Sequence, residues 1–136
     1  MGWLTDIVGR NVVHRGARCS VVCAVLEHGK SPAAEFWEHL DNKTRSQFDV
    51  LFDLMGSTGR IFNQQHFRHE EGEVWCFKRF QCRLACFRDG SSWVLTHGFV
   101  KKQSKWPRSE LERANRIMRE DKARILEGQS KGKGRR

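Results

Sequence analysis

Four segments of the chain show the apolar pattern of buried strands. The first, RCSVVCAVL, is β-branched or apolar at most positions, so we expect it to be buried on both faces. Two later segments are joined by Arg-Asp-Gly-Ser, a typical hairpin connection because Asp-Gly tolerates positive φ. The predicted strands are 18–26, 73–78, 82–87 and 92–100.

Three other segments repeat their apolar residues with helical spacing. The first is expected to begin at Ser31-Pro32, where the serine can cap a helix and the proline suits its first turn. The second follows at Asp41 or Asn42 after a very short connection, which predicts an antiparallel αα-hairpin. The third covers residues 107–126.

The order of these elements, β-α-α-β-β-β-α, predicts a single α+β domain. In this fold class the αα-hairpin and the C-terminal helix pack against a small twisted sheet. The domain is expected to span residues 18–126. Residues 1–17 would form an N-terminal arm, and residues 127–136, rich in glycine and basic side chains, a disordered basic tail.

The charge of the chain narrows the class of partner. The 136 residues carry a formal charge of +9, of which the last ten residues supply +3. The folded part is therefore basic in its own right and favours nucleic acid, an acidic protein or a membrane surface. No apolar run approaches the ~20 residues of a membrane span, and MGWLTDIVGR lacks the features of a secretory signal. We expect a cytoplasmic protein with no membrane partner.

Five cysteines are most simply explained as reduced core residues of a cytoplasmic protein. The alternative is a zinc site built from Cys76, Cys82, His66 and His69. Structural zinc sites usually show closely paired ligands, and this chain has no Cys-x-x-Cys pair. We therefore expect no metal.

A basic cluster follows the last predicted strand. The stretch WVLTHGFVKKQSKWPRSELERA passes from an apolar strand through His97 into four basic residues interleaved with Trp106. Such a pattern at a strand end indicates contact with nucleic acid. Arg83 lies in the preceding apolar strand, where an arginine is costly unless it meets an anion or lines a cleft. His97 is equally compatible with a hydrogen-bonded core histidine.

Residues 18–120 resemble the phage-derived, HigB-like branch of the RelE/ParE toxin superfamily. The resemblance is carried by FKRFQCRLACFRDGSSWVLTHGFVKKQSKWPRSELERA, most specifically by His-Gly-Phe-Val-Lys-Lys at 97–102 followed by Pro107 and a helix. It implies a RelE-like fold and the toxin of a type II toxin–antitoxin pair. Such toxins are endoribonucleases that cleave messenger RNA, often on the ribosome. The resemblance also implies a cognate antitoxin, in this branch often one with a helix-turn-helix domain.

The same resemblance implies the site residues. The basic residue of the family's second strand corresponds to Lys78, the arginine of the next strand to Arg83, and the lysine pair to Lys101 and Lys102. With His97, these are the expected catalytic residues. The expected RNA-binding residues around them are Arg79, Lys105, Trp106 and Arg108.

The chain departs from the family pattern in three ways. Cys76 stands where the family often has an acid, Trp106 stands where it has a helix-capping threonine, and the chain contains no tyrosine. Any family mechanism that needs a tyrosine to orient the base is not available here.

RNA cleavage of this type needs neither a metal nor a cofactor, because the attacking 2′-hydroxyl belongs to the substrate. The enzyme must accept the hydroxyl proton, stabilise the charge on phosphorus and protonate the leaving oxygen. We expect Arg83 to contact the scissile phosphate and Lys78 to assist it. Lys101 or Lys102 is the expected base, if neighbouring cations lower its pKa from ~10.4, and His97 is a further acid or base.

Two other interpretations compete with the enzyme. One is a non-catalytic RelE-like protein that binds nucleic acid or a repressor or antitoxin partner, which the missing acid and tyrosine favour. The other is a plain interaction module whose basic face meets an acidic protein.

Overall fold

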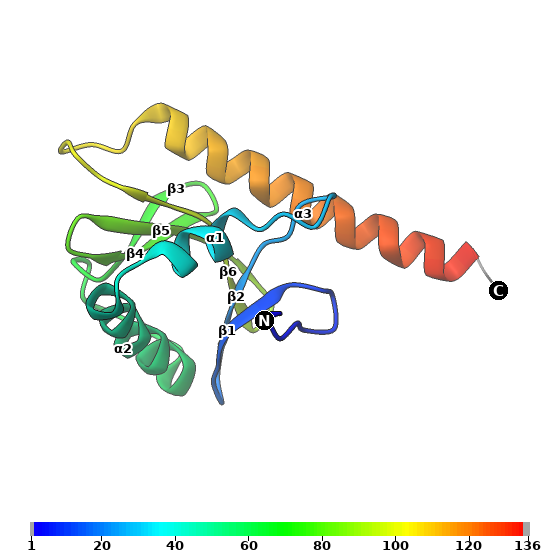
Figure 1. The fold of residues 1–136 in the computed structure, drawn as a ribbon, viewed down its shortest axis with the longest axis horizontal. Coiled ribbons are helices and arrows are strands. Elements are labelled where there is room, and N and C mark those ends of the chain that lie inside the picture. Colours follow the sequence, from blue (N-terminus) through cyan, green and yellow to red (C-terminus); the bar gives the residue numbers. More distant parts are fainter. Residues whose placement is uncertain (1, 135–136) are drawn as a thin grey trace.

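A computed structural model describes residues 2–134 of the chain, and side chains as far as Gln129. In this part of the chain one mixed sheet carries helices on both faces, and helix α3 projects beyond the sheet (Figure 1). None of the described helices has the length and apolar character that a membrane span requires. The elements are β1 Asn11–Arg15, β2 Ser20–Cys23, α1 Pro32–His39, α2 Asn42–Thr58, β3 Phe67–Glu71, β4 Val74–Arg79, β5 Cys82–Asp89, β6 Ser92–Val100 and α3 Arg108–Gly134.

The sheet has the strand order β1-β2-β6-β5-β4-β3. Strands β2 and β6 pair in parallel, and every other neighbouring pair is antiparallel. The long hairpin of β5 and β6 forms the centre, and the shorter β1 and β3 form the two edges. Consecutive side chains of each strand point to opposite faces, so the two faces of the sheet meet different helices.

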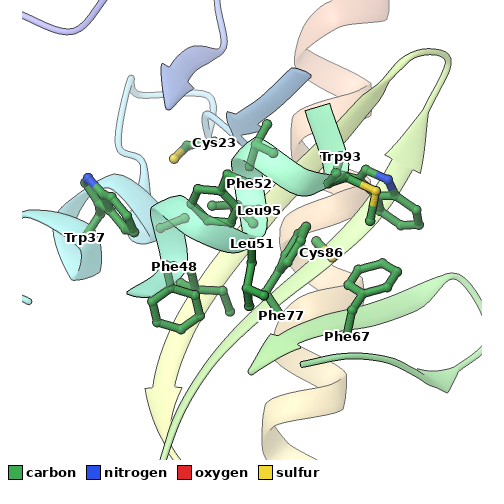
Figure 2. Packing of buried hydrophobic residues seen from close by; sticks show 14 of the residues in the cluster. Cys23, Trp37, Phe48, Leu51, Phe52, Phe67, Phe77, Cys86, Trp93 and Leu95 are labelled. Carbon is green, nitrogen blue, oxygen red and sulfur yellow. The ribbon is translucent and has the colours of Figure 1, made fainter. Parts of the chain in front are cut away.

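One face of the sheet packs against α1 and α2 through a core rich in aromatic rings. Phe48 and Phe52 of α2 are fully buried, and Phe52 meets Phe77 of β4 edge to face at a centroid distance of 5.0 Å. Figure 2 shows these rings in contact with Leu51 and Leu95 between the helix and the strands. This cluster is the largest apolar core of the protein and fixes α2 against the sheet.

The opposite face packs against α3. Here Val22, Phe87 and Val94 of the sheet meet Ile117 and Met118 of the helix. A third, smaller cluster around Ala114 continues the contact toward the start of α3. The three clusters give the protein a helix–sheet–helix layering.

The mixed α+β fold expected from the sequence is confirmed, but the element order differs: it is β-β-α-α-β-β-β-β-α. The expected arm 1–17 contains β1, and the segment before 73–78 contains β3. Both strands lie at an edge of the sheet, where a strand needs little apolar character and often carries charge. Their sequences, NVVHR and FRHEE, accordingly contain several polar residues. Neither therefore shows the apolar pattern of a central strand.

The disordered tail expected from residue 127 is also corrected. Helix α3 continues to Gly134, because a helix that is already nucleated and packed propagates by one hydrogen bond per added residue. The last two residues of the expected tail, 135–136, lie outside the described part of the chain.

The ends of α2 follow the sequence signals, but the expected serine cap of α1 is wrong. Asp41 caps α2 by accepting a hydrogen bond from the Thr44 amide at 2.7 Å, and Gly59 ends the helix with a left-handed φ of 79°. Ser31 precedes α1, but its hydroxyl donates to the Ala24 carbonyl at 2.8 Å rather than capping the helix.

Helix α1 approaches β6 closely at Gly98. A Cβ built on this glycine would overlap the ring of Phe36 in α1. Glycine at this position thus has a steric role, since it lets the helix lie directly on the strand.

We predict that Gly98→Ala destabilises the protein by about 1–3 kcal/mol, the usual cost of overpacking a core. Chemical denaturation followed by circular dichroism measures the effect. The matched control is Gly128→Ala in α3, where an added Cβ meets nothing within 4 Å and should leave the stability unchanged or raise it. Equal stabilities for Gly98→Ala and the wild type would mean that α1 does not lie on β6 as described.

Candidate functional site

A small cavity of about 160 Å³ opens on the α3 side of the sheet, near the ends of strands β3 to β6. Five basic side chains and one carboxylate line it, and we call it the cationic hollow. Its charged residues come from three strands and from the loop between β6 and α3. The lining residues are Arg68, Glu70, Lys78, Arg83, Lys101, Ser104, Lys105 and Trp106.

Strand pairing forces the cations together. Lys78 of β4 lies directly opposite Arg83 of β5, and side chains of such a pair share one face of the sheet. Arg68 of β3 pairs with Cys76, two residues before Lys78, so it belongs to the same face. The amide of Lys101 donates to the Gln81 carbonyl at 2.8 Å, which fixes the loop beside them. Like charges held this close repel unless an anion lies between them.

Arg83 is the most buried of these cations, with 8% of its surface exposed. Its Nη1 donates to the carbonyls of Phe80 at 2.9 Å and Cys82 at 3.0 Å. Its Nε is buried without a hydrogen-bond partner among the described residues. A buried donor without a partner is costly, so the guanidinium is prepared for an acceptor that the protein itself does not supply.

The β4–β5 turn that holds Arg83 is strained. Phe80 has a φ of 52°, in the left-handed region that residues other than glycine rarely adopt. Its ring is exposed and lies under the Lys43 ammonium at 5.5 Å, while its carbonyl accepts from Arg83. Strain of this kind occurs often beside functional sites.

Among the described residues that line the hollow, Glu70 is the one carboxylate, and it is half-buried near the end of β3. Burial raises the pKa of Glu70, although the nearby cations Arg68, Lys78, Lys101 and Arg83 oppose the rise. Burial also lowers the pKa of Lys78, and the charge of Arg83 lowers it further. Burial thus moves the pKa values of both groups toward neutral pH, where a group can both take up and release a proton.

Trp106 forms a wall of the hollow. Its ring meets Phe99 of β6 edge to face at a centroid distance of 4.7 Å, which orients it. The ring is only half-buried, so part of it stays available to a ligand.

His97 does not line the hollow. It is fully buried between β6 and α3, with its Nε2 3.0 Å from the carboxylate of Glu110. Burial lowers the pKa of His97 to about 3, helped by the charges of Arg113 and Arg116, so the ring is neutral. A carboxylate only accepts, so Nε2 donates to Glu110 and Nδ1 is left as an acceptor. Nδ1 lies 3.2 Å from the Thr96 hydroxyl, which also donates toward the Ala85 carbonyl at 3.3 Å. His97 thus fastens α3 to the sheet.

Of the residues expected from the sequence, five meet in the hollow: Lys78, Arg83, Lys101, Lys105 and Trp106. The others lie elsewhere. Lys102 is exposed and does not line the cavity. Arg108 donates to both oxygens of Glu71, at 2.9 and 3.0 Å. Arg79 points to the opposite face of the sheet and donates to the Gln47 carbonyl of α2 at 3.1 Å.

Cys76, at the position of the expected family acid, is fully buried, and burial strongly raises the pKa of its thiol. It cannot act as an acid or base at neutral pH. Glu70 supplies a carboxylate from the adjacent strand instead. Among the described residues, no three His, Cys, Asp or Glu side chains gather in a way that could hold a metal ion.

Sequence reasoning missed Arg68 and Glu70 because it missed β3. A signal was present in the chain: Glu-Gly-Glu at 71–73 is the turn of the β3–β4 hairpin, with a positive φ of 55° at Gly72. Counting back from that turn pairs Arg68 with Cys76, two residues before Lys78, and so places Arg68 on the same face of the sheet as Lys78 and Arg83.

Comparison with known proteins identifies the class of protein. The family model described as "Phage derived protein Gp49-like (DUF891)" matches residues 35–119, which is more than half of the chain. The protein belongs to this phage-derived Gp49-like family, a toxin-like family related to RelE and ParE. A comparison with curated proteins finds no match.

The buried His97 makes the stability of the protein depend on pH. Unfolded, the ring takes up a proton near pH 6.5, whereas in the native protein it does so only near pH 3. Stability should therefore fall as the pH drops from 6.5, by up to about 1.4 kcal/mol per pH unit. Urea denaturation at several pH values measures this slope.

His97→Gln can still donate to Glu110 but cannot take up a proton. It should therefore reduce the fall in stability with decreasing pH by up to about 1.4 kcal/mol per pH unit. His28→Gln, at an exposed position, is the matched control and should leave the slope as in the wild type. Identical slopes in all three proteins would contradict a neutral, buried His97.

Proposed function

We propose that the protein is the toxin of a type II toxin–antitoxin pair, in the HigB-like branch, and that its cationic hollow cleaves messenger RNA without a metal. The supporting observation is the meeting of five basic side chains with one half-buried carboxylate around the unsatisfied Arg83. Membership of a phage-derived, toxin-related family is compatible with this role.

The proposed reaction uses the 2′-hydroxyl of the substrate as the nucleophile. Its oxygen attacks the adjacent phosphorus while its proton passes to a base, and the bond from phosphorus to the 5′-oxygen breaks. The leaving 5′-oxygen takes a proton from an acid in the hollow. The products are a 2′,3′-cyclic phosphate and a 5′-hydroxyl end.

Glu70 is the better base than Lys101 or Lys102, which the sequence favoured. A carboxylate is ionised at neutral pH, and the burial that raises the pKa of Glu70 also makes it a stronger proton acceptor. Lys102 does not line the cavity at all.

The cations divide the remaining roles. Arg83 and Arg68 stabilise the charge that develops on the phosphate oxygens, because guanidinium groups bind phosphate through paired donors. Lys78 has a lowered pKa and is the candidate acid for the leaving oxygen, with Lys101 beside it. Trp106 offers a ring surface on which a base next to the scissile bond can stack.

The partners follow from this function. The substrate is messenger RNA, presented on the ribosome, and a cognate antitoxin with a helix-turn-helix domain neutralises the protein in the cytoplasm. The toxin-like family supports an antitoxin partner.

We predict that the purified protein cuts ribosome-bound messenger RNA in the presence of EDTA and leaves a 2′,3′-cyclic phosphate. Arg83→Ala should lower the rate about 10²–10³-fold, the usual loss for one transition-state charge stabiliser. Glu70→Gln should lower it about 10²–10⁴-fold and remove the acid limb of the pH–rate profile, because that limb reports the base. Rates come from single-turnover assays with labelled messenger.

The matched control is Arg119→Ala, at an exposed position of α3 away from the hollow, which should cut like the wild type. If the wild type cuts neither free nor ribosome-bound RNA, and its induction does not slow growth, the enzyme is refuted and a non-catalytic RNA or antitoxin binder takes its place.

A separate prediction concerns binding alone. On single-stranded RNA with a 2′-deoxy substitution at the scissile position, the double variant Lys101→Ala/Lys105→Ala should reduce the salt slope by about 1.4, or about 0.7 for each lost phosphate contact. Fluorescence anisotropy at several salt concentrations gives the slope. Arg15→Ala/Arg119→Ala removes the same charge from exposed positions elsewhere. Equal slopes for the two double variants would place the RNA outside the hollow.

A further inference from the structure

A second cavity, of about 370 Å³, lies on the opposite face of the sheet from the cationic hollow, near the end of α2. We call it the aromatic groove. Its floor is formed by Met55, Phe67, Trp75 and Trp93. Phe67 precedes Arg68 in β3, and consecutive strand residues point to opposite faces, so the same strand contributes to both cavities.

The aromatic rings of the floor pack against one another. Phe67 stacks on Trp75 at a centroid distance of 5.2 Å and meets Trp93 edge to face at 4.9 Å. Figure 2 shows Phe67 and Trp93 together at one end of the apolar core. The indole Nε1 of Trp93 is buried and has no hydrogen-bond partner in the described part of the chain. Indole N–H groups usually find an acceptor when they are buried, so this donor lacks a partner that a ligand can supply.

The rim of the groove combines apolar and positive groups. Phe62 is 82% exposed, which is unusual for so large an apolar side chain. Arg60 lies over the Phe62 ring at 6.0 Å, and Arg88 lies over the Trp93 ring at 5.6 Å. No carboxylate is found among the described residues that line the groove, so both arginines face it without an acidic neighbour there.

We propose that the aromatic groove binds a segment of a partner protein that places an apolar side chain in the cavity, against the rings of its floor, and carboxylates against Arg60 and Arg88. Tryptophan and arginine are the residue types that most often contribute the largest share of protein–protein binding energy, and methionine is enriched at such interfaces. The charge of the rim requires an acidic segment, and the apolar floor requires a hydrophobic anchor within it.

The groove fits a protein segment better than single-stranded RNA. Bases bind by stacking on exposed ring faces, but Phe67 and Trp93 are each only 5% exposed and present little ring surface. An aliphatic or aromatic side chain of a protein can instead bind by filling the apolar cavity, without stacking on an exposed ring face. The binding proposed here does not depend on RNA cleavage, because the groove and the hollow lie on opposite faces of the sheet.

Selection from a library of random peptides displayed on phage tests this binding with the full-length protein as bait. Enriched peptides should carry a large apolar residue flanked by Asp or Glu. Their affinity should fall at least tenfold for Arg60→Glu/Arg88→Glu. The matched control Arg15→Glu/Arg119→Glu, which makes the same charge change at exposed positions elsewhere, should bind as the wild type does.

The indole N–H signals in nuclear magnetic resonance locate the bound ligand. An enriched peptide should shift the signal of Trp93 and leave that of Trp106, in the hollow, in place. The proposal is overturned if no peptide is enriched, or if enriched peptides bind Arg60→Glu/Arg88→Glu as tightly as they bind the wild type. It is also overturned if single-stranded RNA, rather than peptide, shifts the Trp93 signal. None of these results bears on cleavage in the hollow.

Discussion

The structure depends on the attachment of α3 to the sheet by buried polar contacts at two places. Asp121 is fully buried and accepts hydrogen bonds from Arg10 at 2.6 and 3.0 Å and from the Val25 amide at 2.9 Å. Toward the start of the helix, Glu110 accepts from the buried His97. Removing one partner of a buried ion pair such as Arg10–Asp121 typically costs about 3–5 kcal/mol, because the other charge stays buried and unpaired. These contacts set the position and the direction of the helix.

The cationic hollow is a consequence of this attachment. Because α3 is held at Glu110, the loop that leads into it must run past the ends of β4 and β5. That course brings Lys101, Lys105 and Trp106 beside Arg83. The repulsion between the gathered cations is tolerated since the rest of the helix buries Ile117 and Met118 on the sheet. A rigid scaffold that holds like charges together is suited to an anionic ligand.

The sheet separates two surfaces of different chemistry. The α3 face carries basic groups around a small polar cavity, whereas the α2 face carries rings around an apolar groove. Alternation along single strands makes this possible, as at Phe67 and Arg68 of β3. The two proposed sites, one for RNA and one for a partner protein, therefore do not overlap.

The sequence predicted the parts of the fold that apolar patterns define. Strands β2, β4, β5 and β6 and the three helices were visible because each buries apolar residues at a fixed period. The edge strands β1 and β3 were not predicted, because an edge strand is partly exposed to solvent and its sequence contains many polar residues. Of the residues that line the cationic hollow, the sequence singled out Arg83 and Lys78, which lie on inner strands with apolar patterns. It did not single out Glu70, which lies on the polar edge strand β3.

His97 shows a second limit of sequence reasoning. Its position beside the basic cluster indicated an acid or base, but only the tertiary structure reveals that its partner is Glu110 of α3. Strand alternation does not separate His97 from Lys101, because the two positions are four residues apart and belong to the same face of the sheet. They differ in position along that face: His97 lies within β6 beneath Glu110 of α3, whereas Lys101 lies just beyond the end of the strand.

The most direct test of the account is whether the unpaired Nε–H of Arg83 receives a phosphate. The measurement is the arginine Nε–H nuclear magnetic resonance spectrum of the protein, titrated with an RNA oligonucleotide that carries a 2′-deoxy substitution at the scissile position. We predict that the Arg83 signal shifts and becomes protected from exchange with solvent on binding, while the exposed Arg119 signal does not move. An Arg83 signal that stays unchanged when the RNA is bound would contradict it.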